Sequence, residues 1–210
     1  MYAFEYHKPS SVEEAVAALS GKDDPKIVAG GMTLLPTMKQ RLAAPSDLVD
    51  LGGIKDLAGI REEGNALVIG AMTTHATVAR SELVASRIPA LAKLAGGIGD
   101  PQVRHRGTIG GSVANADPAA DYPAALLGLN ATVVTNQREI AAEDFFIDLF
   151  ETALEPEEVI TAVRFPVPQR AGYSKFPNPA SRYAIVGVFV AQTGAGTRVA
   201  VTGAKGSVFR

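Results

Sequence analysis

Two glycine pairs, each closely followed by a hydroxyl residue, constrain this chain more than any other feature. Gly30-Gly31 follows the apolar run KIVA and precedes Thr33, and Gly110-Gly111 directly precedes Ser112. Glycine lets backbone N–H groups approach an anion closely, and the start of a helix adds free donors and a positive dipole. Two such turns predict a cradle that holds the two phosphates of a dinucleotide from opposite sides.

The same glycine pairs can also be ordinary turns. Neither pair fits G-x-G-x-x-G, and the chain contains no G-x-x-x-x-G-K-[ST] segment, so a Rossmann or Walker mechanism is not supported. The residues alone therefore leave phosphate binding and simple chain reversal open.

The segment ADPAADYP (116–123) adds two carboxylates between the second glycine pair and an apolar run. We expect Asp117 to cap a helix whose first turn contains Pro118 and Asp121. A carboxylate at Asp121 could accept hydrogen bonds from a ribose hydroxyl or a flavin ring N–H. Plain helix capping is the alternative for both aspartates.

The composition excludes several kinds of chemistry. The chain has no cysteine, which rules out disulfides, a thiolate nucleophile, cysteinyl iron–sulfur clusters and thiolate zinc sites. Its three histidines, His7, His75 and His105, show no ligand spacing, so we predict no metal site and expect any redox metal on a partner. We expect His75 to cap or pack and His105 to be exposed.

The net charge and the hydropathy pattern limit the possible binding partners and the expected cellular location. A net charge of -2 gives no footprint for nucleic acid. No apolar run is long enough to span a bilayer, and the first residues do not resemble a signal peptide. We therefore expect a cytoplasmic protein with no transmembrane segment.

Hydrophobic periodicity and turn residues predict an α+β chain without strict βαβ rotation. The expected helices cover residues 12–19, 33–42, 74–84 and 89–95, with a short helix and loop over 142–149. The expected strands cover residues 26–30, 47–51, 131–136 and 157–168, with a hairpin over 61–72 and antiparallel strands from 173 onward. These last strands leave an uncovered edge, so we expect the final subdomain to be incomplete.

Two long segments resemble one family. AGGMTLLPTMKQRLAAPSDLVDL (29–51) and GDPQVRHRGTIGGSVANADPAADYPAALLGLNATVV (99–134) are similar to the FAD-binding medium subunit of molybdenum hydroxylases, in particular the carbon monoxide dehydrogenase medium chain and the xanthine dehydrogenase flavin domain. The resemblance covers residues 2–210. It implies the two-subdomain FAD-binding fold of the vanillyl-alcohol oxidase / p-cresol methylhydroxylase type, with subdomains at 1–55 and 56–170 and an incomplete third at 171–210.

The resemblance also implies a set of FAD-binding residues. The first pyrophosphate loop corresponds to Ala29, Gly30, Gly31, Met32, Thr33 and Leu34, and the second to Thr108, Ile109, Gly110, Gly111 and Ser112. Met32 departs from the family, which often has a polar residue there. Asp121 matches an aspartate that reaches the flavin, and Ile98 a position near the adenine. Ile160 and Lys175 match residues at the cofactor, and Tyr183 could lie against the isoalloxazine ring.

A function follows from the same resemblance. The implied role is an FAD-carrying electron-transfer subunit, partnered by a molybdenum-cofactor large subunit and a 2Fe-2S small subunit, which passes electrons to a quinone, NAD or oxygen. The flavin supplies the redox chemistry, so we expect no catalytic side chain in this chain. The alternatives are a stand-alone flavin oxidoreductase and a structural domain that has lost FAD.

Overall fold

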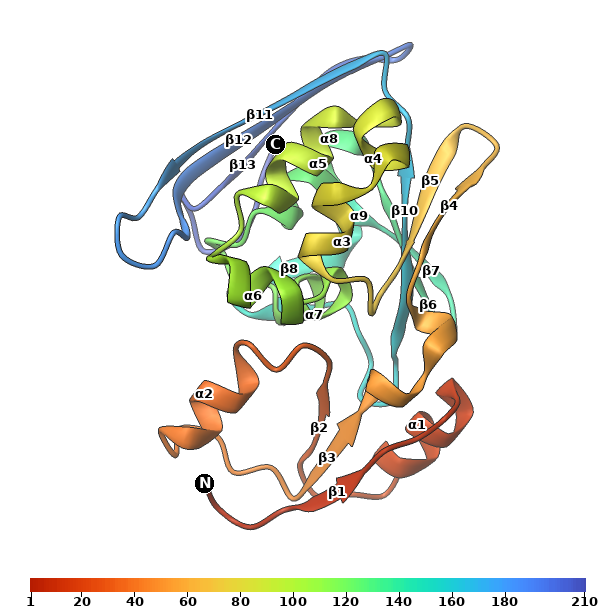
Figure 1. Ribbon diagram of the computed structural model, residues 1–210, viewed down its shortest axis with the longest axis vertical. Helices are drawn as coiled ribbons and strands as arrows, with labels where there is room; N and C mark the ends of the chain where they lie inside the picture. The colour runs from red at the N-terminus through yellow and green to blue at the C-terminus, as the bar shows by residue number, and fades with distance from the viewer.

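The computed structural model describes residues 1–210 and has an α+β architecture, as predicted. Four sheets of three, five, three and two strands share the chain with nine α-helices. Figure 1 shows the N-terminal sheet at one end of the molecule, the helices and five-stranded sheet in the middle, and the C-terminal strands at the other end. The chain therefore runs from one end of the molecule to the other.

The N-terminal sheet is short and parallel. Its strands are β1 (Glu5–His7), β2 (Pro25–Val28) and β3 (Asp47–Asp50), in the order β1-β3-β2. Parallel neighbours need crossover connections, which are made by α1 (Val12–Leu19) and α2 (Leu34–Lys39). The Ser11 hydroxyl caps α1 by accepting from the Glu14 N–H. Two 3-10 turns, Leu51–Gly53 and Lys55–Leu57, lead onward.

The five-stranded sheet is antiparallel in the order β4-β5-β10-β6-β7. Its strands are β4 (Ile60–Glu63), β5 (Ala66–Gly70), β6 (Thr132–Thr135), β7 (Glu139–Ala141) and β10 (Ile160–Pro166). The helices of this region are α3 (His75–Arg80), α4 (Glu82–Arg87), α5 (Pro89–Gly96), α6 (Pro101–Arg106), α7 (Ile109–Asn115), α8 (Tyr122–Leu129) and α9 (Ala142–Phe145). Every residue of α8 is buried, which suits its apolar sequence and makes it the central helix of the core.

The C-terminal strands pack on the same core. They are β11 (Arg170–Pro177), β12 (Ala184–Thr193) and β13 (Gly196–Thr202). A separate two-stranded ribbon, earlier in the chain, comprises β8 (Phe146–Asp148) and β9 (Glu151–Thr152). Tyr173 and Phe189 belong to a core cluster of 30 buried residues. A Cβ added to Gly128 of α8 would lie 2.8 Å from the Phe189 ring. The strands therefore rest directly on α8.

The sequence misplaced three elements. The helix expected over 74–84 is two helices, because the Ser81 hydroxyl accepts from the Val84 N–H and so starts α4 anew. Helix α6 was not expected, although Asp100 caps it and Pro101 occupies its first position. The region 142–149 contains strand β8 in addition to the expected helix.

Two adjacent residues of β12 test how the C-terminal strands are held. Phe189 is fully buried against α8, whereas its neighbour Val190 points to the opposite face and is 37% exposed. Phe189→Ala should lower the free energy of unfolding by about 3–5 kcal/mol because it leaves a cavity in the shared core. Val190→Ala should cost under about 1 kcal/mol. Urea unfolding of both variants measures the difference, and equal costs would contradict a core shared by β12 and α8.

Candidate functional site

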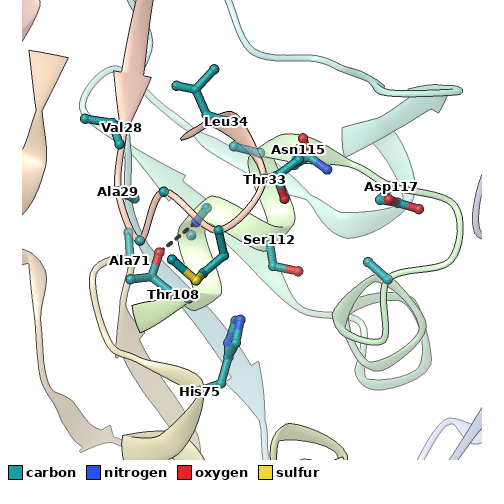
Figure 2. Close-up of a pocket in the computed structure, with 18 of the residues that line it drawn as sticks. Val28, Ala29, Thr33, Leu34, Ala71, His75, Thr108, Ser112, Asn115 and Asp117 are labelled. Carbon is teal, nitrogen blue, oxygen red and sulfur yellow. Dashed lines mark hydrogen bonds between the residues drawn. The ribbon is translucent and has the colours of Figure 1, made fainter. Parts of the chain in front are cut away.

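A cleft of about 480 Å³ lies between the N-terminal sheet and the helices of the middle region. It is lined by the loop after β2, by the start of α7, by the segment before β10 and by the turn after β11. Figure 2 shows Thr33 from one wall and Ser112, Asn115 and Asp117 from the other around the same space. Both glycine pairs of the sequence thus meet in one cavity, as the dinucleotide hypothesis requires.

The first loop joins β2 to α2 and cannot carry side chains at its glycines. A Cβ on Gly30 would lie 2.2 Å from the Arg106 carbonyl oxygen, and Gly31 has a φ of +71°. The N–H groups of Gly30, Gly31, Met32 and Thr33 form no hydrogen bond within the protein. Thr33 precedes α2 but makes no side-chain capping bond. This loop therefore presents a row of free backbone donors beside the cleft, which is the feature that binds phosphate.

The second glycine pair differs from the expectation. Gly110 and Gly111 are not a turn before a helix but form the first turn of α7, which the Thr108 hydroxyl caps by accepting from the Gly111 N–H at 3.2 Å. Gly110 donates to the Ala71 carbonyl at 2.8 Å, and a Cβ on Gly110 would lie 2.6 Å from the Ala71 Cβ. Close packing on Ala71 explains why residue 110 is glycine.

The N–H groups of this helical turn are already engaged. Ile109 donates to the Thr73 carbonyl and Ser112 to the Thr108 carbonyl, both at 3.0 Å. The second loop can therefore offer the Ser112 hydroxyl and the positive end of α7, but few free backbone donors. Ile109 itself is fully buried and does not line the cleft.

Asp121 lies at one end of the cleft in a buried polar cluster. The Tyr173 hydroxyl donates to it at 2.5 Å, and the Lys175 ammonium lies 2.9 Å from Oδ1 and 3.0 Å from Oδ2. Burial raises the pKa of Asp121, while Tyr173 and Lys175 act in the opposite direction. Lys175 also donates to the Gly97 carbonyl at 3.1 Å. Lys175 does not line the cleft, so it acts there through Asp121.

The expected capping role of Asp117 is wrong. Helix α8 begins at Tyr122, with Asp121 at its N-cap position but making no side-chain capping bond. The Asp117 carboxylate instead accepts from the Ala119 N–H at 2.8 Å, two residues on, in a local turn. An Asx turn of this kind competes with helix initiation, which explains why the helix starts later than the sequence indicates.

The remaining predicted residues are divided between the two ends of the cleft. Met32, Ile98, Ile160 and Tyr183 all line it. Ile98 follows Gly97 and so shares the Asp121 end, whereas Ile160 starts β10 at the other end. Burial and the nearby Asp117 charge raise the pKa of Tyr183.

His75 is a cleft residue whose position the sequence did not reveal. It is 4% exposed, lines the cleft beneath Gly107, and its ring lies 5.4 Å from that of Tyr122. Its Nδ1 has no hydrogen-bond partner. Burial, together with the Arg104 charge, lowers the pKa of His75 to about 4. The expectation that His75 packs is confirmed, and His105 is exposed as expected. His75 lies at the cleft because its ring packs against Gly107. Gly107 is distant in the sequence, so no local pattern reveals this contact.

Two negative observations complete the site. No group of three or more histidine, aspartate or glutamate side chains is arranged to hold a metal ion. None of the helices is both long enough and apolar enough to cross a membrane.

A glycine-built cleft between two subdomains, with free N–H donors on one wall and a helix start on the other, is typical of a dinucleotide-binding flavoprotein. The family model for the FAD binding domain in molybdopterin dehydrogenase matches residues 2–168. The chain belongs to this family, and FAD is its cofactor. It is an oxidoreductase subunit of the medium-chain class of molybdenum hydroxylases.

Curated relatives include medium chains of dehydrogenases and hydroxylases. The chain is 43% identical to the carbon monoxide dehydrogenase medium chain of Afipia carboxidovorans over 92% of its own length and 70% of that protein. It is 40% identical to the nicotine 6-hydroxylase medium subunit of Paenarthrobacter nicotinovorans, covering 99% of this chain and 77% of the relative.

Solved structures agree with the fold. Carbon monoxide dehydrogenase from Hydrogenophaga pseudoflava superposes with a TM-score of 0.92 at 40% identity, covering 99% of this chain and 77% of that one. Quinoline 2-oxidoreductase from Pseudomonas putida 86 gives 0.91 at 33% identity, covering 98% and 76%. The predicted α+β FAD-binding fold is confirmed, and the chain spans about three quarters of the length of these solved chains.

The buried His75 should make stability depend on pH. The pKa of His75 is about 4 in the folded chain, below the ordinary value of 6.5, so the unfolded chain binds a proton more readily than the folded chain. The free energy of unfolding therefore falls as the pH is lowered from 6.5 to 4. His75→Gln removes this contribution, so its free energy of unfolding should fall less between pH 7 and 4 than that of the parent protein. Urea titrations at each pH measure this, with exposed His105→Gln as the control. Parallel profiles for all three proteins would contradict the assignment.

Proposed function

We propose that this chain carries FAD as the electron-transfer subunit of a molybdenum hydroxylase complex, taking electrons from iron–sulfur clusters on a partner and passing them to an external acceptor. The observation that carries this proposal is the run of N–H groups at Gly30–Thr33 without a partner in the protein, in a loop that lines the same cleft as the start of α7. The chain has no cysteine to ligate iron–sulfur clusters, which agrees with clusters held by another chain.

The residues divide the cleft into three parts for an extended cofactor. The first loop (Ala29–Leu34) and the second loop (Thr108–Ser112) would bind the pyrophosphate, with Ser112 adding a hydroxyl donor. Asp121 and Tyr183 lie at one end, where the flavin would sit, and Lys175 would hold the Asp121 carboxylate in place. Ile160 lies at the other end, which leaves that end to the adenosine.

When bound, FAD supplies the one- and two-electron chemistry, and the chain supplies binding and orientation. No side chain in the cleft is set up as an acid or base at neutral pH. The Asp121 carboxylate is occupied by Tyr173 and Lys175, and burial keeps His75 neutral. We therefore assign no catalytic residue to this chain.

The partners in this proposal are a molybdenum-cofactor large subunit and a 2Fe-2S small subunit, with a quinone, NAD or oxygen as acceptor, in the cytoplasm. Supporting this, the relatives are named as medium chains or subunits of complexes. We also propose subdomain boundaries at 55/56 and 170/171. The strands of the three larger sheets, at 5–50, 60–166 and 170–202, are consistent with that division.

Glycine substitutions test the cofactor site directly. Gly30→Ala places a methyl group 2.2 Å from the Arg106 carbonyl oxygen, and Gly110→Ala places one against Ala71. Each should weaken FAD binding by about tenfold or more, because Gly30→Ala pushes the first loop away from the second wall and Gly110→Ala displaces the start of α7 from Ala71. Gly172→Ala in β11 has nothing within 4 Å of its added methyl group and should bind FAD like the parent protein.

The measurement is a titration of the apo-chain with FAD, followed by its visible spectrum and fluorescence. A folded parent chain that takes up no FAD would contradict the proposed function and favour a structural domain. Copurification with cysteine-rich and molybdenum-containing chains would support the complex, and turnover by the isolated chain would favour a stand-alone enzyme.

A further inference from the structure

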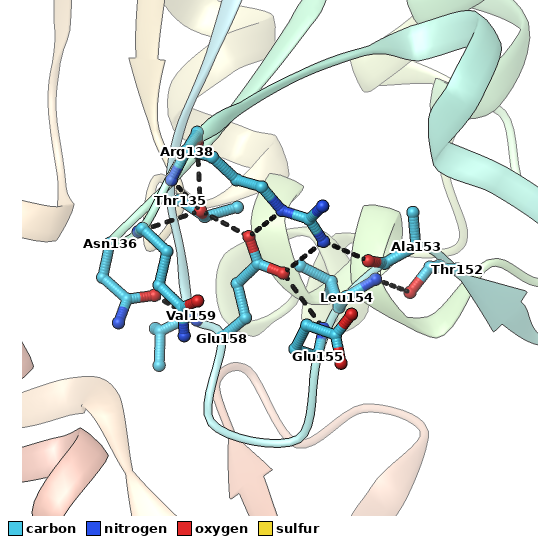
Figure 3. Close-up of polar contacts among 10 residues, drawn as sticks. Thr135, Asn136, Arg138, Thr152, Ala153, Leu154, Glu155, Glu158 and Val159 are labelled. Atoms are coloured by element: carbon cyan, nitrogen blue, oxygen red, sulfur yellow. Dashed lines mark hydrogen bonds and ion pairs between the residues drawn. The ribbon is translucent and has the colours of Figure 1, made fainter.

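One short segment, residues 153–160, runs from β9 into β10 and lies at the end of the cleft remote from Tyr183. Leu154, Glu158, Val159 and Ile160 of this segment line the cleft. Figure 3 shows that the segment is held by the turn between β6 and β7, which contributes Thr135, Asn136 and Arg138. This contact fixes a wall of the cleft from outside it.

Glu158 is the centre of this contact. Its side chain has no exposed surface, and its carboxylate accepts from four donors. Arg138 donates through Nε and Nη2, each at 2.9 Å, the Thr135 hydroxyl at 2.7 Å and the Glu155 N–H at 3.0 Å. The carboxylate is therefore fully satisfied although it is buried, and Arg138 holds its pKa at about 2.

The turn between β6 and β7 also forms hydrogen bonds with both ends of the segment 153–160. Arg138 Nη2 donates to the Ala153 carbonyl at 2.7 Å. The Asn136 side chain accepts from the Val159 N–H at 2.8 Å, and the Asn136 N–H donates to the Val159 carbonyl at 3.0 Å. Residues 153 and 159 are thus fixed to one turn, with Glu158 between them.

Val159 connects this segment to the opposite wall. It is 1% exposed and belongs to the small core cluster of the N-terminal part, with Leu19, Val49, Leu51 and Ile54. It is the one residue of that cluster that follows residue 57. The position of the segment therefore sets where the two walls meet at this end.

We propose that Glu158 and Arg138 are positioning residues that shape the adenosine end of the FAD site through the segment 153–160. This inference rests on the proposed function. The end they support is apolar, with Val28, Leu51, Leu154 and Ile160, and it lies beyond the glycine loops from Asp121 and Tyr183. An apolar slot suits a flat base, whereas the Asp121 end suits a ring with polar edges.

The variant Glu158→Gln tests the proposal with little change in volume. In either orientation the amide NH₂ group faces an Arg138 nitrogen, together with the Thr135 hydroxyl or the Glu155 N–H, so donors of the cluster lose their acceptor and the segment shifts. Affinity for FAD and for ADP should fall about tenfold. Affinity for FMN, which has no adenosine, should not change. All three are measured by titration or competition on the full chain.

Glu139→Gln is the matched control. Glu139 of β7 and Arg164 of β10 also form a two-point pair, with both contacts at 2.8 Å, but neither residue lines the cleft. This variant should bind FAD, ADP and FMN like the parent protein. If Glu158→Gln does not fold, Arg138→Lys keeps the charge but not the fork that reaches Glu158 and Ala153, and it should show the same loss.

The outcomes separate the two proposals. Loss of FAD and ADP with FMN retained supports the positioning role. An equal loss of all three ligands in Glu158→Gln would mean that the pair only stabilises the fold, and unchanged ADP binding would overturn the proposal outright. A parent chain that binds neither FAD nor ADP would instead overturn the proposed function, and the positioning role with it.

Discussion

The cleft depends on a backbone contact that only glycine permits. Gly30 of the first loop lies against Arg106 and Gly107 of the second wall, where a Cβ would approach the Arg106 carbonyl oxygen to 2.2 Å. Gly107 in turn covers His75, whose Nε2 would lie 2.7 Å from a Cβ at position 107. The contacts of Gly30 with Gly107 and of Gly107 with His75 leave no room for a side chain at either glycine. The separation of the two walls is therefore fixed by packing, which resists small displacements more sharply than surface charges do.

This packing makes the two glycine loops unequal. The N–H groups of Gly30 through Thr33 are free, whereas those of Ile109 through Ser112 donate hydrogen bonds to Ala71, Thr73 and Thr108. One loop thus supplies backbone donors, and the other supplies a rigid helix start and the Ser112 hydroxyl. An anion held between them therefore gains its backbone donors from the first loop, and a hydroxyl donor and the positive end of a helix from the second.

The sequence predicted what local chemistry determines. Glycine pairs, β-branched runs and the hairpin turn at Gly64-Asn65 are local signals, and they located the strands and the two loops. It failed where partners are distant. Gly110-Gly111 looked like a turn because its contact with Ala71 is invisible in a local window. The error at Asp117 is local instead, because an aspartate can either cap a helix or form a turn with the residue two positions on, here Ala119. Most site residues came from the family resemblance, which encodes tertiary contacts. Glu158 lies 20 residues from Arg138, and only the fold brings them together.

Two ion pairs, each with a buried carboxylate, hold the two ends of the cleft that glycine packing leaves undefined. Asp121 with Lys175 joins α8 to β11 at one end, and Glu158 with Arg138 joins the segment before β10 to the β6–β7 turn at the other. Such pairs contribute little net stability because the buried carboxylate must lose water, but they penalise any geometry in which a partner is missing. A ligand that spans the cleft therefore meets ends whose positions are specified by charge and a middle whose width is specified by shape. Substitution in the middle should change affinity for every part of the ligand, whereas substitution at an end should change only the half that lies there.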